Sequence, residues 1–286
     1  RGAKKVTEQA LPPPAAPSEG RGGGRRKRVI VLAALLLLLV FGERRAARGM
    51  IYHPRPESGT PCPQGIEDVT FDSEDGTKLH GWIARRPGAT RAVLMAHGNA
   101  EIVAENGGAI LAVAKAANAS TFMFDYRGFG RSAGSPDETG VCADARAALA
   151  ELERLTSIPR ARTIVLGHSL GGAVAIDLVS RSPDVGGLVV LSTFTSIDDM
   201  SRWLFGASLG FISPESWESA RKIAAIRCKK LIVHGTADKV IPYEMGWTLF
   251  QLAPEPKHFQ TVQEGNHYTL DAALPEIERS ATEWLP

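Results

Sequence analysis

Five stretches of this 286-residue chain are nearly continuous apolar runs, and they constrain its fold more than any other feature. A strand with one face in water alternates apolar and polar residues, whereas a strand buried on both faces is apolar throughout. The runs are the cores of RAVLMAHG (91–98), STFMFDYRG (120–128), RTIVLGHS (162–169), GLVVLST (187–193) and KKLIVHGTAD (229–238). Most of the intervals between them are long enough for crossover helices. The pattern predicts an α/β domain with a mostly parallel central sheet and helices on both faces.

Further elements flank these runs. We expect a hairpin of two strands, EDVTFDS (67–73) and KLHGWIARR (78–86), joined by a turn at Asp75 and Gly76. Residues 139–155 have apolar side chains at helical spacing and predict a helix. HFQTV (258–262) predicts the last strand, followed by a C-terminal helix.

The first 28 residues form a different kind of sequence. They are rich in Pro, Gly and Arg and carry eight Lys or Arg against two Glu, whereas the rest of the chain is net acidic. Such a segment buries too little apolar surface to fold, so we expect residues 1–28 to be disordered. Residues 29–41 are an apolar segment, residues 42–65 are predicted to be a linker, and residues 66–286 are predicted to be the folded α/β domain.

The apolar segment VIVLAALLLLLVF (29–41) is shorter than the roughly 20 residues that a spanning helix usually needs. Three interpretations stay open: a signal anchor in a locally thinned bilayer, a cleaved signal peptide, and a buried core helix. More positive charge precedes the segment than follows it. An anchor would therefore leave the N-terminus in the cytoplasm and the folded domain outside it, whereas cleavage would give a secreted or periplasmic protein. The apolar segment favours a membrane over nucleic acid as the partner of the basic tail.

The stretch Gly167-His168-Ser169-Leu170-Gly171 fits the pattern G-x-S-x-G and lies between an apolar strand and an alanine-rich helix. In a parallel sheet, functional groups gather at the carboxyl ends of the strands. We expect the chain to turn sharply here, with Ser169 at the apex in a strained conformation and the glycines giving the room that a Cβ would fill. Ser169 is therefore the candidate nucleophile.

A serine hydroxyl needs a base, and the base needs an orienting carboxylate. Where the serine lies in a G-x-S-x-G turn of an α/β sheet, the acid and the histidine follow it along the chain in the order Ser, acid, His. Asp238 follows the strand-like run LIVHGTA, and His267 lies between the predicted last strand and the C-terminal helix. The alternatives are His258 as the base, although it begins a strand, and Asp198 or Asp199 as the acid.

When a serine attacks a carbonyl group, the carbonyl oxygen becomes an oxyanion, which needs two backbone N–H donors. We expect these from Leu170, directly after the serine, and from Asn99, in the turn that follows the first apolar run. His97 and His168 flank these donors, and we expect them to have a structural role. Cys62, Cys142 and Cys228 are too few and too scattered for a disulfide framework or a metal site, and the reaction requires no metal or organic cofactor.

These residues resemble the α/β-hydrolase family, and more closely its membrane-anchored serine hydrolases related to lipases and acyl-protein depalmitoylases. The resemblance covers roughly residues 50–286 and implies the same triad of Ser169, Asp238 and His267. It also implies that DYRG (125–128) holds a loop beside the site. The matching motifs are HGN (97–99), DYRGFGRSAGSP (125–136), GHSLGGAVA (167–175), STFTS (192–196), HGTADKVIP (234–242) and GNH (265–267).

Residues 194–222 are predicted to form a small cap. Their apolar side chains either line an acyl pocket or pack as a helical lid on the domain. The apolar residues of this cap are Met200, Trp203, Leu204, Phe205, Leu209, Phe211, Ile212 and Trp217.

The chain is expected to cleave a small acyl ester, thioester or lipid. The alternatives are a serine peptidase of the same fold and a non-catalytic membrane-anchored binding module.

Overall fold

The computed structural model describes residues 48–284, except 50, 58, 209–212 and 214. The chain divides into two units, Arg1–Glu43 and Arg44–Pro286, and all of the described residues lie in the second. The predicted tail and the apolar segment 29–41 lie outside the described residues. Among the helices that are described, none has the length and apolarity needed to cross a membrane.

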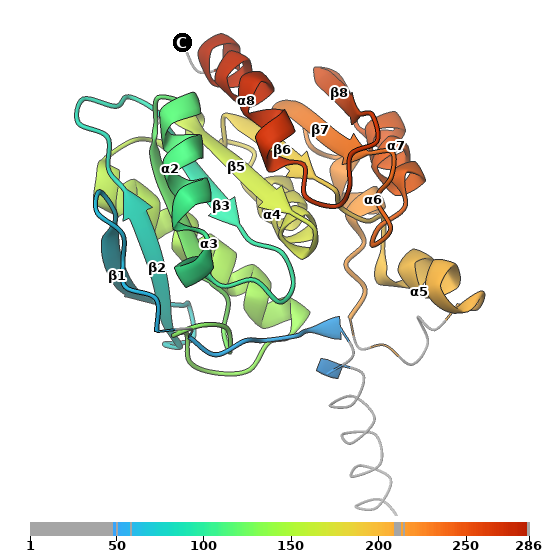
Figure 1. Cartoon of the computed structure of the whole chain (residues 1–286), viewed down its shortest axis with the longest axis horizontal. Helices are drawn as coiled ribbons and strands as arrows, with labels where there is room; N and C mark the ends of the chain where they lie inside the picture. The colour runs from blue at the N-terminus through green and yellow to red at the C-terminus, as the bar shows by residue number, and fades with distance from the viewer. Residues whose placement is uncertain (1–47, 50, 58, 209–212, 214, 285–286) are drawn as a thin grey trace, which may run out of the picture. The chain divides into compact units, whose positions relative to one another are not determined.

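An eight-stranded sheet forms the centre of the fold, in the order β1-β2-β4-β3-β5-β6-β7-β8 (Figure 1). The first two pairings, β1 with β2 and β2 with β4, are antiparallel, and all the others are parallel. The five apolar runs are β3 to β7, as predicted. The strands are β1 (Glu67–Asp72), β2 (Lys78–Ala84), β3 (Ala92–Ala96), β4 (Ser120–Asp125), β5 (Thr163–His168), β6 (Gly187–Leu191), β7 (Lys229–Gly235) and β8 (Lys257–Val262).

Helices cover both faces of the sheet (Figure 1). Alternate residues of one strand enter opposite cores: Leu94 belongs to the core on the side of α3 and α4, whereas Val93 and Met95 belong to the core on the side of α2. This two-sided burial explains why the central strands are apolar throughout. The helices are η1 (Val103–Glu105), α2 (Gly107–Ala116), α3 (Glu138–Thr156), η2 (Arg160–Arg162), α4 (Leu170–Arg181), α5 (Ile197–Phe205), α6 (Ser219–Ile223), α7 (Tyr243–Leu252) and α8 (Leu270–Trp284).

The predicted hairpin is β1 and β2. Gly76 has a φ of +80°, which favours glycine, and the Thr77 N–H donates to Asp75 Oδ1 over 3.1 Å. The turn predicted at Asp75 and Gly76 is therefore confirmed.

The described part of the predicted cap contains α5 and α6. At the end of α5, Trp203, Leu204 and Phe205 are exposed. Trp217, in contrast, is fully buried, and its Nε1 donates to Tyr52 Oη over 3.1 Å. The apolar cap residues therefore do not form a single surface. Leu209, Phe211 and Ile212 lie outside the described residues.

Candidate active site

Ser169 lies between the end of β5 and the first residue of α4, where the chain turns from strand to helix. Its backbone has a φ of 56° and a ψ of −120°, a conformation that residues other than glycine rarely adopt. Such strain costs roughly 1–3 kcal/mol and persists only where the surroundings hold it. Here the Ser169 N–H donates to the Leu191 carbonyl (2.9 Å), and Thr193 Oγ1 donates to the Ser169 carbonyl (2.8 Å). The strained turn predicted at Ser169 is confirmed.

Glycines are needed on both sides of this turn because the backbone approaches itself closely. A Cβ at Gly167 would lie 2.0 Å from the Gly171 carbonyl oxygen. A Cβ at Gly171 would lie 2.0 Å from the carbonyl oxygen of Ala96, the last residue of β3. The first turn of α4 therefore lies directly against the end of β3. A side chain at Gly167 would push β5 away from α4, and one at Gly171 would push α4 away from β3.

Two backbone N–H groups near this turn are the predicted oxyanion donors. Leu170 is the first residue of α4, so its N–H has no acceptor within the helix. Within the part of the chain that the structure describes, neither this N–H nor that of Asn99 makes a hydrogen bond. The Asn99 side chain is itself held, because its Nδ2 donates to the Ile51 carbonyl (2.6 Å) and its Oδ1 accepts from the His53 N–H (2.9 Å).

The loop that carries Asn99 is also fixed from β4. Asp125 Oδ1 accepts the Val103 N–H (2.8 Å), and Tyr126 Oη donates to the His97 carbonyl (2.7 Å). All four residues are buried. Asp125 and Tyr126 belong to the DYRG motif, so these contacts agree with the role that the resemblance implies for it.

His267 and Asp238 form a direct pair. His267 Nδ1 and Asp238 Oδ2 are 2.8 Å apart, and Asp238 Oδ1 accepts the N–H groups of Val240 (2.8 Å) and Ile241 (3.0 Å). Burial opposes ionisation of Asp238, but hydrogen bonds from His234, His267 and Ile241 outweigh it and hold the pKa of this carboxyl well below its ordinary value of 3.8. A carboxylate at Nδ1 keeps the proton of the neutral ring there, so Nε2 is the acceptor.

The His267 Nε2 atom is unpaired among the described residues, and no hydrogen bond joins it to the Ser169 hydroxyl. The connection between the two residues runs instead through His168, whose ring centroid is 4.8 Å from that of His267. The structure therefore brings Asp238 and His267 into contact. Ser169 directly follows His168, whose ring lies beside that of His267. Hydrogen bonds between a nucleophile and its base are often long before substrate binds.

His234 is a site residue that the sequence reasoning missed. It is fully buried on β7, with Nε2 3.3 Å from Asp238 Oδ2 and 3.0 Å from the Ile241 carbonyl. It therefore supports Asp238 from the strand that precedes it. Its position four residues before Asp238, at the end of an apolar run, was the available signal.

His168 and Glu101 form a second pair, and Glu101 was also missed. His168 Nδ1 lies 2.9 Å from Glu101 Oε1, and His168 Nε2 lies 3.0 Å from the backbone carbonyl of His267. Burial opposes both charges. The mutual hydrogen bond outweighs it, so the pKa of Glu101 falls to about 2 and the pKa of His168 rises above 6.5. The structural role expected for His168 is consistent with these contacts.

The alternative acids and base lie elsewhere. Asp199 accepts hydrogen bonds from Thr195 and Ser196 at the start of α5, and Asp198 pairs with Arg202 over 2.7 Å. His258 is an exposed residue of β8. Neither aspartate makes a hydrogen bond to a histidine in the described part of the chain, so Asp238 and His267 are the better candidates.

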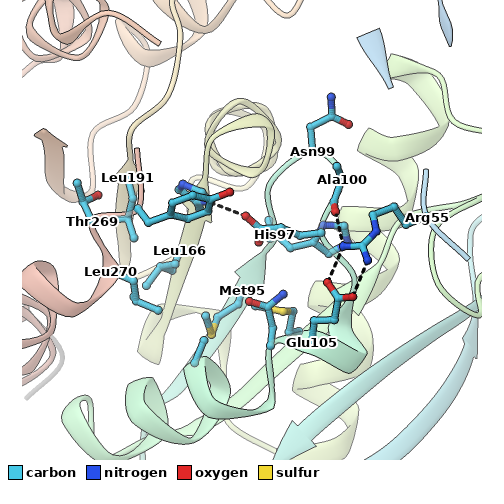
Figure 2. A pocket seen from close by; sticks show the side chains of 17 residues that line it. Arg55, Met95, His97, Asn99, Ala100, Glu105, Leu166, Leu191, Thr269 and Leu270 are labelled. Carbon is cyan, nitrogen blue, oxygen red and sulfur yellow. Dashed lines mark hydrogen bonds and ion pairs between the residues drawn. The ribbon is translucent and has the colours of Figure 1, made fainter. Parts of the chain in front are cut away.

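A cavity of about 360 Å³ lies behind this site, on the α2 and α8 side of the sheet. Its apolar lining includes Met95, Leu166, Leu191 and Leu270, and on another side Arg55 pairs with Glu105 (Figure 2). His168 and Asn99 also line this cavity, whereas Ser169, Asp238 and His267 do not. The cavity therefore touches the residues that surround the site, and no residue of α5 contributes to it.

Comparison with known proteins places the chain in a family. A family model described as serine aminopeptidase, S33, matches residues 87–218. The α/β hydrolase domain-containing protein WAV2 of Arabidopsis thaliana is 34% identical over 193 residues, 62% of this chain and 63% of WAV2. The uncharacterized protein YfhR of Escherichia coli K12 is 31% identical over 231 residues, 78% of this chain and 81% of YfhR. The chain belongs to the α/β-hydrolase family.

The solved structures agree with this assignment at the level of the fold. The Pyrococcus furiosus esterase Pf2001 superposes with a TM-score of 0.67 over 82% of this chain and 100% of its own, at 18% identity. At that identity the likeness establishes the α/β-hydrolase fold alone. The predicted fold class, a mostly parallel sheet covered by helices on both faces, is thus confirmed.

Proposed function

We propose that this α/β-hydrolase cleaves carboxylic acyl esters or thioesters through a covalent acyl-enzyme. Ser169 is the nucleophile, His267 is the general base and then the general acid, and Asp238 fixes the tautomer of His267. The backbone N–H groups of Asn99 and Leu170 stabilise the oxyanion.

The observation that carries this proposal is the Asp238–His267 pair, in which His267 Nε2 has no partner among the described residues. The Asp238 carboxylate occupies Nδ1 at 2.8 Å, so the remaining nitrogen can accept a proton. Ser169 supplies a hydroxyl at the end of β5, in the strained strand-to-helix turn that is typical of a nucleophilic serine. The N–H groups of Leu170 and Asn99, which make no hydrogen bond among the described residues, would supply the oxyanion donors that acyl transfer needs.

The reaction follows from these roles. As Ser169 Oγ attacks the carbonyl carbon, His267 Nε2 takes the hydroxyl proton, and the carbonyl oxygen becomes an oxyanion that accepts from Asn99 and Leu170. The imidazolium then gives its proton to the departing alcohol or thiol, which leaves the acyl group on Ser169. A water molecule, deprotonated by His267, attacks the acyl carbon, releases the acid and regenerates the serine.

An ester or thioester is favoured because the fold is shared with a solved esterase, and the sequence resembles lipases and depalmitoylases. A serine peptidase is the second candidate, and the description of the matching family model favours it. Both use the same residues. Two series of substrates separate the esterase from the peptidase: acyl esters of increasing chain length, and aminoacyl amides. We expect the esters to be cleaved with the higher kcat/KM.

The first experiment is labelling of the full chain with a fluorophosphonate probe. We expect wild type to be labelled, Ser169→Ala to lose all labelling and His267→Ala to lose most of it. Ser180→Ala is the matched control, because it removes a hydroxyl from α4, the helix that follows Ser169, where among the described residues that hydroxyl donates to the Asp177 carbonyl. A folded wild type without labelling contradicts the proposal and favours a non-catalytic binding module.

We further propose that residues 29–41 associate the enzyme with a membrane as an uncleaved anchor, with the catalytic domain outside the cytoplasm. The basic tail before the segment supports this orientation. Extraction of cell membranes with alkaline carbonate is the test. We expect the full chain to stay in the pellet and the chain lacking residues 29–41 to be released. A wild-type protein that is soluble and lacks its first 41 residues indicates a cleaved signal peptide instead.

A further inference from the structure

Both ring nitrogens of His168 are engaged, one by an acidic side chain and one by a backbone carbonyl. The His267 carbonyl oxygen accepts and cannot donate, so His168 Nε2 must carry a proton. Glu101 Oε1 lies 2.9 Å from Nδ1, and the lowered pKa of Glu101 makes it a carboxylate that also only accepts. His168 therefore carries protons on both nitrogens and is an imidazolium paired with the Glu101 carboxylate.

We propose that Glu101 and His168 form a largely buried ion pair that positions the base and the oxyanion loop for the reaction. The proposal rests on the function proposed above and adds two positioning residues to it. Their side chains are 22% and 14% exposed, so water screens their attraction only weakly.

The pair connects three parts of the site. His168 directly precedes Ser169, and its Nε2–H holds the main chain of His267. Glu101 lies two residues after Asn99, and its carboxylate also interacts with the backbone N–H of Gly98. A Cβ at Gly98 would lie 2.5 Å from Glu101 Oε1 and 3.0 Å from His168 Nδ1, so the loop packs directly on the pair. One ionic contact thus fixes the loops that carry His267 and Asn99 relative to each other.

Neither residue is placed to react. Both nitrogens of His168 are occupied, so the ring has no site for accepting a proton during turnover. His168 acts through the backbone of His267, and Glu101 acts through His168 and Gly98. Displacement of a base or donor by about 1 Å can cost roughly 100-fold in rate, which is how such residues affect catalysis.

The pair also predicts a pH dependence. The charged and titratable groups around His168 are Glu101, the more distant Asp238 and the rings of His267 and Tyr268. Burial disfavours the imidazolium, but the hydrogen bond and charge of Glu101 outweigh it, so the pKa of His168 is above 6.5. When the pH rises through that pKa, His168 loses one proton and can donate to only one of its two acceptors. We therefore expect kcat to fall on the alkaline side.

The test uses the full chain with Glu101→Gln, His168→Gln and the double variant. Each single variant leaves the partner charge in a largely buried site, and we expect kcat to fall about 10- to 100-fold with KM changed less than about 3-fold. The alkaline decrease moves to lower pH in Glu101→Gln and is absent in His168→Gln. Two neutral amides can bond to each other and to the His267 carbonyl, so the double variant recovers part of kcat and has no alkaline decrease.

Glu74→Gln is the matched control, because it removes the same charge from an exposed ion pair with Arg146. We expect it to keep wild-type kcat and pH dependence. If Glu101→Gln and His168→Gln also keep both, the inference is overturned. Fluorophosphonate labelling separates the two proposals, because a labelled wild type with unaffected variants overturns only the ion pair, whereas an unlabelled wild type overturns the proposed function.

A measurement on wild type does not depend on whether the variants fold. In ¹⁵N-histidine-labelled full chain, both ring nitrogens of His168 should be protonated at pH 7, where an unperturbed histidine is mostly neutral. A spectrum in which His168 carries a single ring proton at pH 7 overturns the proposal.

Discussion

Two buried histidine–aspartate pairs differ in one respect. In the first, on β2 and β4, His80 Nδ1 is 2.9 Å from Asp125 Oδ2, and His80 Nε2 is 3.2 Å from Asp68 Oδ2. In the second, on the loops after β7 and β8, His267 Nδ1 is 2.8 Å from Asp238, and Nε2 has no partner within the described residues. A histidine that transfers protons needs one uncommitted nitrogen. Neither burial nor a carboxylate partner separates the two histidines, whereas the free nitrogen does.

We call the first pair closed, because both ring nitrogens of His80 have a partner, and the second pair open, because among the described residues His267 Nε2 has none. The surroundings explain why the first pair is closed. His80 lies directly opposite Asp125 in the register of two antiparallel strands, and Asp68 on β1 reaches the other side of the ring. Arg131 adds a positive charge beside Asp68. Burial lowers the pKa of His80, but its bonds to Asp125 and Asp68 outweigh this and leave the pKa raised above 6.5. A strand thus fixes His80 in a charge cluster, whereas a loop leaves His267 open on one side.

The sharpest way to test this difference is to remove one carboxylate that contacts each histidine. Asp238→Asn removes the charge that fixes the Nδ1–H tautomer of His267, and we expect kcat/KM to fall roughly 10³- to 10⁴-fold. Asp68→Asn is the same substitution at the carboxylate beside His80 Nε2 and should change kcat/KM less than about 3-fold. Both are measured on an acyl ester, with circular dichroism as the check on folding. Equal losses in the two variants would contradict the assignment of chemistry to the open pair.

The closed pair should affect stability instead. His80→Ala leaves the Asp125 and Asp68 carboxylates without their shared partner, and breaking a buried ion pair in this way costs about 3–5 kcal/mol. We expect urea unfolding to show a loss of that size, with a loss of kcat much smaller than that of Asp238→Asn, because Asp125 keeps its bond to the Val103 N–H. A stable variant with lost activity would show that His80 takes part in the reaction.

The local parts of this arrangement were predictable from the sequence, and the long-range parts were not. The turn at Ser169 follows from two glycines at fixed spacing, and Asp238 and His267 follow from their positions after apolar runs. Glu101, in contrast, is separated from His168 by 67 residues, and its role depends on how β3 and β5 pair. The contact between Tyr52 and the buried Trp217 spans 165 residues, so the sequence alone could not separate Trp217 from the exposed apolar residues of α5.

The charge on His80 also predicts a pH dependence of stability. Because its pKa is raised on folding, the cluster of His80, Asp125 and Asp68 contributes fully below the unfolded value of about 6.5 and loses this contribution as pH rises through the folded value. The difference in unfolding free energy between wild type and His80→Ala should therefore be larger at pH 6 than at pH 9. The pKa of His168 is also raised on folding, but His168 is present in both wild type and His80→Ala, so its contribution cancels in the difference. A difference that grows with pH would show that His80 is neutral in the folded protein.

The smallest effect is expected where the closed pair meets solvent. Arg131 Nη1 is 2.6 Å from Asp68 Oδ2, but the two side chains are 42% and 37% exposed. Exposed ion pairs contribute about 0.2–1 kcal/mol and are screened by salt, so Arg131→Gln should lower the unfolding free energy by less than about 1 kcal/mol, and by less still in 0.5 M NaCl. Urea unfolding at the two salt concentrations measures this. A salt-independent loss above about 2 kcal/mol would place Arg131 inside the buried cluster, so that a cation and two carboxylates, rather than the two carboxylates alone, hold His80 closed.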